Sequence, residues 1–566
     1  MAVCVLKTTF PTERGSIGAS SWASVKSLVR LCLAISIVAA ASVSAQQSDE
    51  PLPSFAQLQV AGARIGQIRV VTGDIFDTTD PKEANFLFGL ANTLHIKTRP
   101  DVIERALLFK AGDLLSVRVL EETERILRSN SYIYDVKYRV LNYRDGIVDI
   151  EVATRDTWTL GPGINAARSG GANASGYSVS EGNLLGTGIA LSVARSNGVD
   201  RSSNAFQFSS PRAFGTWTAL NLSHAVNSDG RLDSITVLRP FYALDARWSA
   251  GVAVSRDERI ESIYNAGNIA SQYRHRQELA EVFGGWSAGL IDGWARRYSL
   301  GLSLQDDRFA IDSGLVAPPK LPADKRFVGP FFRFELLEDR FDRQLNRNLI
   351  GRPEFFALGV AAKMQLGWAS AALGSSQDAL LYSGSVSRGF EPAPDSTLIT
   401  AALISGQYVA GQVQRQRVGA QAQYYLPQGH RWLFYGSAAG DVLTRPEAID
   451  ELLLGGDNGL RGYPLRYQSG HKRLLFTVEE RFYTDLYVWQ LFRVGGAGFV
   501  DVGRAWDGTN PNTVSPGWLS NVGIGLRIVS SRSSSGNVLH VDLAVPLRAP
   551  AEIKKVQLLI RTKLSF

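Results

Sequence analysis

Cysteine and long apolar runs are almost absent from this chain. Its 566 residues include only Cys4 and Cys32, and after residue 45 no stretch approaches the roughly 18 apolar residues of a spanning helix. The second absence excludes a helical membrane protein. It does not exclude a transmembrane β-barrel, because a barrel carries its apolar residues at every second position.

The chain also has little excess positive charge outside its first 45 residues. The net charge is +7, and the first 45 residues supply +3 of it, from Lys7, Arg14, Lys26 and Arg30 against Glu13. The remaining charge is spread without a basic run. This pattern argues against nucleic acid as a partner.

Residues 1–45 have the pattern of a cleavable signal peptide. Lys26 and Arg30 precede an apolar core from Leu31 to Ala41, and Val43-Ser44-Ala45 supplies a small-x-small cleavage site. A short membrane anchor is the alternative, but the core is too short to span a bilayer. Cleavage after Ala45 would remove both cysteines, so the mature chain would contain neither a disulfide framework nor thiol chemistry.

Residues 63–157 have a mixed α/β pattern, after a polar and loose lead-in over residues 46–62. The periodicity predicts strands and helices in the order strand, helix, helix, strand, strand. The predicted ranges are Ile68–Val71, Lys82–Leu94, Val117–Ser129, Ile133–Tyr143 and Gly146–Ala153. The last two strands are joined by Arg144-Asp145-Gly146, whose Asp-Gly step favours a tight hairpin. We therefore expect a small α+β domain.

From residue 158 to residue 566 the helical period is replaced by alternation of apolar and polar residues. Clear examples are Tyr298–Leu304, Leu358–Trp368, Val522–Ile528 and Leu539–Val545. A soluble sandwich also alternates, with its apolar face packed as a core. Strand length, the signal peptide and long polar connections such as Gln305–Phe327 instead favour lipid outside and a polar lumen inside. We predict a transmembrane antiparallel β-barrel of about 16 strands.

The last predicted strand, Val556–Phe566, alternates up to the final residue. Leu564 and Phe566 share the apolar face, while Arg561 and Lys563 lie on the other. A terminal aromatic ring can lie at the membrane interface and close the barrel without leaving a tail. We interpret Leu564 and Phe566 as the barrel closure and C-terminal signal.

Four motifs in order carry a more specific resemblance. The segment Gly455–Tyr463 resembles the Arg-Gly-Phe/Tyr loop of the BamA/TamA and two-partner-secretion superfamily of outer-membrane barrels, also called the bacterial surface antigen family. Three strand motifs of that superfamily are similar to Thr477-Val478-Glu479, Gly498–Trp506 and His540–Leu547. Residues 65–158 resemble a single POTRA domain, most clearly at Phe109–Asp113 and Ser131–Val136.

The resemblance implies a site in the barrel lumen. The loop would fold inward, and Arg461 would meet Asp501, and also Glu479, on the inner wall, where a guanidinium can make bidentate bonds to a carboxylate. Gly462 would allow close backbone approach or a positive φ, and Tyr463 would pack against the wall. The alternative is that Arg461 is an ordinary lumen charge and the glycines only form a surface turn.

The resemblance also implies a location and a function. The barrel would lie in the outer membrane of a Gram-negative cell, with the N-terminal domain in the periplasm, and would assemble or translocate polypeptides. Expected partners are outer-membrane lipids, accessory envelope proteins, and an unfolded or secreted polypeptide client. The alternatives are a passive pore or lipid or small-solute channel, and a structural surface antigen.

The expected client would bind the POTRA-like domain and a weak barrel seam. That seam would lie between the first strand, Thr157–Ala166, and the last, Val556–Phe566. Gly161-Pro162-Gly163 would weaken it because proline cannot donate to the strand ladder. The same three residues could instead be a plain hinge between the domain and the barrel.

No catalytic, cofactor or metal site is predicted. Gly455–Gly462 is glycine-rich but lacks the Lys-Ser/Thr of a phosphate loop. The six histidines show no metal-ligand spacing, and Asp306-Asp307 falls in an expected polar loop. We therefore predict that the chain is not an enzyme.

Overall fold

The computed structural model describes residues 52–447, 450–508, 516–534 and 536–563. The predicted signal peptide, and the closure residues Leu564 and Phe566, lie outside these ranges. The described residues from Pro53 onward belong to one unit. No helix within them is both long enough and apolar enough to cross a bilayer.

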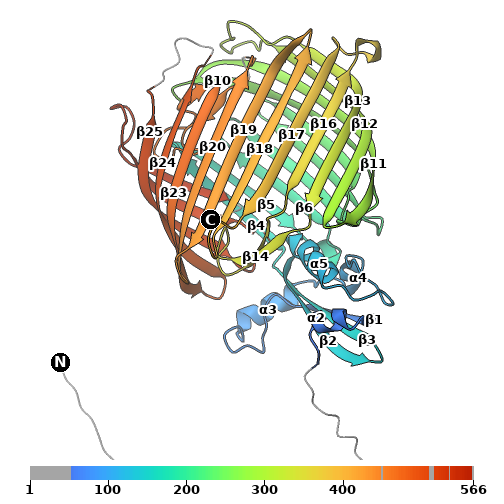
Figure 1. Cartoon of the computed structure of the whole chain (residues 1–566). Coiled ribbons are helices and arrows are strands. Elements are labelled where there is room, and N and C mark those ends of the chain that lie inside the picture. Colours follow the sequence, from blue (N-terminus) through green and yellow to red (C-terminus); the bar gives the residue numbers. More distant parts are fainter. Residues whose placement is uncertain (1–51, 448–449, 509–515, 535, 564–566) are drawn as a thin grey trace, which may run out of the picture. The chain divides into compact units, whose positions relative to one another are not determined.

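The N-terminal part is a three-stranded sheet covered by helices (Figure 1). The sheet order is β1-β3-β2, with β1 parallel to β3 and β2 antiparallel to it. Its elements are α2 (Phe55–Val60), β1 (Arg64–Gly73), α3 (Phe86–Leu94), α4 (Pro100–Glu104), α5 (Val117–Ser129), β2 (Ile133–Arg144) and β3 (Ile147–Asp156). The predicted helix over Val117–Ser129 is confirmed at both ends, and so is the Asp-Gly turn, with φ of 50° at Asp145 and 75° at Gly146.

Three local features differ from the prediction in this part. The first helix begins at Phe86 rather than at residue 82, because the Asn85 side chain caps it by accepting from the Phe88 N–H at 3.0 Å. The segment over residues 46–62 is not loose throughout, because α2 forms there behind the capping residue Ser54. Helix α4, which starts at Pro100, was not expected.

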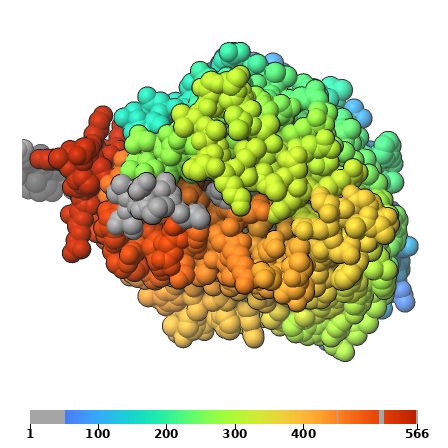
Figure 2. Space-filling view, turned by 90° about the horizontal axis from the view of Figure 1, so that it is seen from above, coloured from blue at the N-terminus to red at the C-terminus, as the bar shows by residue number. Residues whose placement is uncertain are grey.

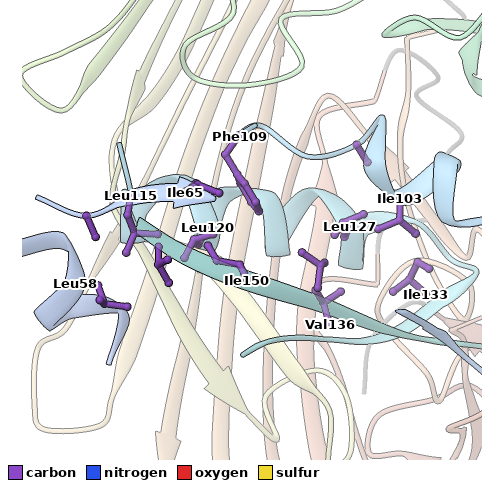
Figure 3. Close-up of a cluster of buried hydrophobic side chains, with 14 of the residues drawn as sticks. Leu58, Ile65, Ile103, Phe109, Leu115, Leu120, Leu127, Ile133, Val136 and Ile150 are labelled. Carbon is purple, nitrogen blue, oxygen red and sulfur yellow. The ribbon is translucent and has the colours of Figure 1, made fainter. Parts of the chain in front are cut away.

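A buried apolar core holds this part together (Figure 3). Helix α5 contributes Leu120 and Leu127, which are 4% and 1% exposed. They pack in one cluster with Ile103 of α4, Ile133 of β2 and Ile150 of β3. The helical spacing of the sequence therefore placed Leu120 and Leu127 correctly on the buried face of α5. The same spacing placed Glu122 on the solvated face, which is wrong, because that side chain is 5% exposed and accepts from the Leu244 N–H at 2.7 Å.

The rest of the chain closes into an antiparallel barrel of 20 strands within the described ranges. The strands, in chain order, are β4 (Leu160–Ser169), β5 (Ala172–Glu181), β6 (Ala190–Asn197), β7 (Ser202–Ala213), β8 (Thr218–Asn227), β9 (Gly230–Arg239), β10 (Trp248–Asn265), β11 (Asn268–Ile291), β12 (Trp294–Ala310), β13 (Lys325–Glu338), β16 (Ala361–Ala369), β17 (Ala379–Phe390), β18 (Thr397–Val409), β19 (Gln412–Pro427), β20 (Trp432–Thr444), β23 (Lys472–Val488), β24 (Phe492–Trp506), β25 (Leu519–Ser530), β26 (Val538–Pro546) and β27 (Gln557–Lys563). Short 3₁₀ turns occur at Leu184–Gly186 and Ala371–Leu373.

The expected count of about 16 strands is wrong because the connections are shorter than assumed. Residues 160–239 alone carry six strands, β4 to β9. Strands β4 and β5 are joined by Gly170 and Gly171 only, whose φ angles are 54° and 85°. The polar connection predicted over Gln305–Phe327 is shorter in the structure, because β12 continues to Ala310 and β13 begins at Lys325.

The two faces of the barrel wall have opposite character. On β25 the apolar side chains Ile524 and Leu526 are 66% and 42% exposed. Arg527, the next residue along the strand, faces the other side of the wall and is fully buried. The same alternation on β26 exposes Leu543 and buries Asp542. A sandwich would bury its apolar face, so this pattern contradicts the sandwich alternative and gives an apolar exterior around a polar lumen.

Two long connections enter the barrel from opposite ends. We call the end where β4 begins the proximal rim and the end where β4 turns into β5 the distal rim. The lumen loop (residues 445–471) starts from the distal rim and contains β21 (Leu452–Leu454) and β22 (Gln468–Gly470). The lumen hairpin (residues 339–360) starts from the proximal rim and contains β14 (Phe341–Leu345) and β15 (Pro353–Ala357). Figure 2 looks onto the distal rim, where the yellow-green chain after β12 reaches toward the middle of the barrel end.

Candidate functional site in the barrel lumen

The lumen loop is closed at its base and folded tightly at its tip. Strands β21 and β22 pair from Leu452 with Gly470 to Leu454 with Gln468. Beyond them the chain doubles back so closely that a Cβ on Gly456 would lie 2.6 Å from the Tyr463 carbonyl oxygen. Only glycine fits at that approach, and the fold presents the Arg-Gly-Tyr segment to the inner wall.

Arg461 is buried against two acidic side chains of the wall. Its Nε and Nη2 donate to the two oxygens of Asp501 on β24, at 2.8 and 2.7 Å. Its Nη1 donates to Glu479 Oε1 on β23 at 2.8 Å. The side chain of Arg461 is only 4% exposed and that of Asp501 is fully buried. Two ionic partners around one guanidinium compensate for the desolvation of all three charges.

Neighbouring side chains donate further hydrogen bonds to Asp501. Thr477 Oγ1 donates to Asp501 Oδ1 at 2.9 Å, and Asn521 Nδ2 donates to Asp501 Oδ2 at 2.8 Å. The guanidinium carbon of Arg461 also lies 3.4 Å from the ring centroid of Phe499. Asp501 therefore accepts four hydrogen bonds, and the aromatic face adds a cation–π contact.

Gly462 and Tyr463 fix the loop beside Arg461. The Gly462 N–H donates to Asn521 Oδ1 at 3.1 Å, and a Cβ on this glycine would lie 2.6 Å from the Asn521 Cβ. Close approach, not a positive φ, is thus the reason for glycine. The Tyr463 hydroxyl lies 3.1 and 2.8 Å from the carbonyl oxygens of Ser520 and Arg548, and its ring is fully buried.

A second arginine of the loop binds near the distal rim. Arg466 makes two 2.6 Å bonds to Asp200, which lies in the turn between β6 and β7, and its guanidinium lies over the Tyr264 ring at 4.5 Å. The hydrogen bond from Arg466 holds the pKa of the Asp200 carboxyl below its usual range, even though burial opposes the shift. The loop is therefore attached at two points, one deep and one near the distal rim.

A cavity of about 840 Å³ remains beside the loop. Its lining includes polar and charged side chains of the wall and the loop, among them Glu281, Gln365, Gln407, Arg417 and Glu451. A polar space of this size holds water readily. The lumen is thus partly filled by protein and partly open.

No family model matches the chain, and no curated protein matches it. Among solved structures, it is similar to BamA from Haemophilus ducreyi lacking POTRA domains 1–3, with 13% identity, a TM-score of 0.41, and coverage of 88% of this chain and 85% of that one. It is similar to CdiB from Escherichia coli, with 13% identity, a TM-score of 0.48, and coverage of 88% and 76%. The values for CdiB from Acinetobacter baumannii are 13% identity, a TM-score of 0.42, and coverage of 88% and 73%.

The structure brings together Arg461, Gly462 and Tyr463 with Asp501 and Glu479. Sequence reasoning missed two further members of the cluster. Asn521, on β25, binds both the Gly462 N–H and the Asp501 carboxylate. Arg481 Nε donates to Glu479 Oε2 at 2.9 Å from two residues further along β23. The only available signal was that both are polar residues on the lumen side of an alternating strand.

Proposed function

We propose that this chain is an outer-membrane barrel that assembles or translocates polypeptides, and that its seam receives the client. The observation that carries the proposal is the pairing of β27 with β4. Within the described residues it consists of one register pair, Ile560 with Arg168. The flanking junctions are far longer, with ten pairs between β4 and β5 and seven between β26 and β27.

A short seam is an accessible strand edge. Within residues 160–169 and 557–563, the N–H and C=O groups that β4 and β27 do not pair with each other can accept another strand by β-augmentation. Gly161, Pro162 and Gly163 lie within β4 rather than in a hinge, and Pro162 has no N–H to donate across either edge. These residues support a seam that opens at low cost toward the bilayer.

The N-terminal part supports a periplasmic role for residues 63–157 as a single POTRA-like domain. Its order of strand, helices and two strands agrees with the resemblance. Strands β1 and β2 are the edges of its sheet, so the domain offers incoming chains a further strand edge. Because β3 leads directly into β4, a client held at this sheet would be delivered to the proximal rim.

Locking the seam tests the proposal directly. The variant Arg168→Cys with Ile560→Cys places two thiols at the paired positions, and the native cysteines precede the predicted cleavage site. The matched control, Ala166→Cys with Ser175→Cys, locks the continuous junction between β4 and β5. We expect the oxidised seam variant to fail to replace the wild type on depletion in the native host, with accumulation of unfolded barrel precursors or of an unexported partner.

Reductant should restore activity to the seam variant, while the control pair should support activity in both redox states. If the oxidised seam variant functions as well as the control, lateral opening is wrong.

A passive channel is the second candidate, and the polar cavity of about 840 Å³ is the observation that favours it. Steady conductance in a planar bilayer that rises little when Gly455–Gly470 is deleted would support it. Absent or flickering conductance that rises strongly on that deletion would support the gated barrel.

A further inference from the structure

The tip of the lumen hairpin is held by a carboxylate cap. The Glu354 carboxylate on β15 accepts the backbone N–H groups of Arg347, Asn348 and Leu349 at 3.1, 3.0 and 3.0 Å. Such a cap fixes the backbone of the turn and orients its outward carbonyl groups. The hairpin can therefore transmit a displacement from one of its contacts to another.

This tip is anchored on the inner wall of the barrel. The carbonyl oxygen of Arg347 accepts from Arg481 Nη1 at 2.8 Å and from the Tyr483 hydroxyl at 3.0 Å, both on β23. Ile350, which is 4% exposed, packs in one cluster with buried side chains of six strands. These side chains are Tyr425, Leu433, Tyr435, Tyr483, Ala497, Val529 and Val538.

The anchor of the hairpin and the anchor of the lumen loop share one carboxylate. Glu479 Oε2 accepts from Arg481 Nε at 2.9 Å, while Oε1 of the same group accepts from Arg461 Nη1 at 2.8 Å. Glu479 is 5% exposed and Arg481 is 3% exposed. A continuous buried path thus runs from Arg461 through Glu479 and Arg481 to the Arg347 carbonyl.

We propose that the lumen loop and the lumen hairpin form one coupled plug, in which Arg481 is the positioning residue that joins its two halves. If the loop leaves, Glu479 loses one cation, and Arg481 is drawn onto both oxygens of that carboxylate and away from the Arg347 carbonyl. If the hairpin leaves, Arg481 loses its neutral acceptor and competes with Arg461 for Glu479. Release of either end therefore lowers the cost of releasing the other.

The proposal goes beyond the proposed function in assigning regulation to the lumen. It depends on that function only in taking the loop as the gate. Its test contains no client, so failure of coupling and failure of polypeptide assembly or export are distinguishable.

The test is a double-mutant cycle on open probability in planar bilayers containing the purified full-length mature protein. Arg461→Gln weakens the loop end, and Tyr483→Phe removes one bond to the hairpin without changing charge. We expect the double variant to depart at least threefold from the product of the single effects. The matched control is Tyr382→Phe, which removes a 2.8 Å bond to the Gln416 side chain between two wall strands, β17 and β19, and thus leaves the hairpin contacts in place. Its effect should multiply with that of Arg461→Gln.

The decisive experiment repeats this double-mutant cycle in the Arg481→Lys variant. Lysine keeps the charge beside Glu479, but it lacks the planar group that reaches Glu479 and the Arg347 carbonyl together. We expect the cycle to become multiplicative in this background, while the gel shift on heating shows that the barrel remains folded. Multiplicative effects in the wild-type background, or unchanged coupling in the Arg481→Lys background, would overturn the proposal.

Discussion

Arg461 and Asp501 meet fork to fork, with two parallel bonds of 2.8 and 2.7 Å in the interior of the barrel. Both side chains are almost completely shielded from solvent. The pair therefore differs from a surface salt bridge, which contributes little. Breaking it leaves Asp501 buried and charged, with Thr477 and Asn521 as its remaining hydrogen-bond donors among the described residues.

The first prediction concerns this pair. We expect Arg461→Ala to destabilise the folded barrel by about 3–5 kcal/mol, the usual cost of removing one partner of a buried pair. Thermal unfolding in detergent, followed by the gel shift of the folded barrel, measures the loss. Arg445→Ala is the matched control, since that exposed side chain of the same loop makes one 3.3 Å bond to a backbone carbonyl. Equal losses in the two variants would make Arg461 an ordinary lumen charge.

The second prediction concerns Gly462. Gly462→Ala would place a methyl group 2.6 Å from the Asn521 Cβ, so the loop must move away from the wall. We expect a loss of heat resistance of roughly 1–3 kcal/mol, as overpacking commonly costs, together with increased conductance. Gly498→Ala on β24 is the control, because nothing lies within 4 Å of its added methyl group. A harmless Gly462→Ala variant would show that the close approach is not needed.

The sequence predicted much of the fold because alternation and helical spacing are local properties. The outward rows on β25 and β26, the ends of α5 and the Asp-Gly turn all followed from such spacing. The strand count did not, because tight turns such as Gly170-Gly171 carry no length signal that separates them from long loops. The lumen hairpin was also missed, since its fixed tip depends on tertiary contacts of Glu354 and Arg347.

The residues of the lumen site were also predicted only in part. Arg461, Asp501 and Glu479 could be named from motifs, although the motifs lie on separate segments of the chain. Asn521 and Arg481 could not, because every second residue of a barrel strand faces the lumen and many of these residues are polar. Which of them meet depends on strand register, and the sequence alone did not determine the register.

The third prediction concerns the outer attachment of the loop. Asp200→Asn removes the charge that Arg466 binds through two 2.6 Å bonds, but the Asp200 side chain is 43% exposed. We expect a loss of under about 1 kcal/mol in heat resistance, because solvent screens such a pair. The loss should shrink further at high salt, whereas that of Arg461→Ala should not. A loss as large as that of Arg461→Ala would place the main anchor at the rim.

The last prediction is a pH dependence that originates at Glu451, beside the cavity and outside the strands. Burial raises the pKa of the Glu451 carboxyl to about 7, well above the ordinary value for glutamate. The folded state therefore binds a proton that the unfolded state releases at lower pH. Stability from this group is complete below the ordinary pKa and declines as pH rises toward 7.

The substitution Glu451→Gln keeps the neutral form at every pH. We expect it to match the wild type in heat resistance near pH 4 and to exceed it at pH 8, with the difference developing between those values. Glu552→Gln is the control, since that side chain is exposed and should leave the wild-type profile unchanged. Parallel profiles for the wild type and Glu451→Gln would show that Glu451 titrates as an ordinary solvated carboxylate, because only a shift between folded and unfolded states produces a slope.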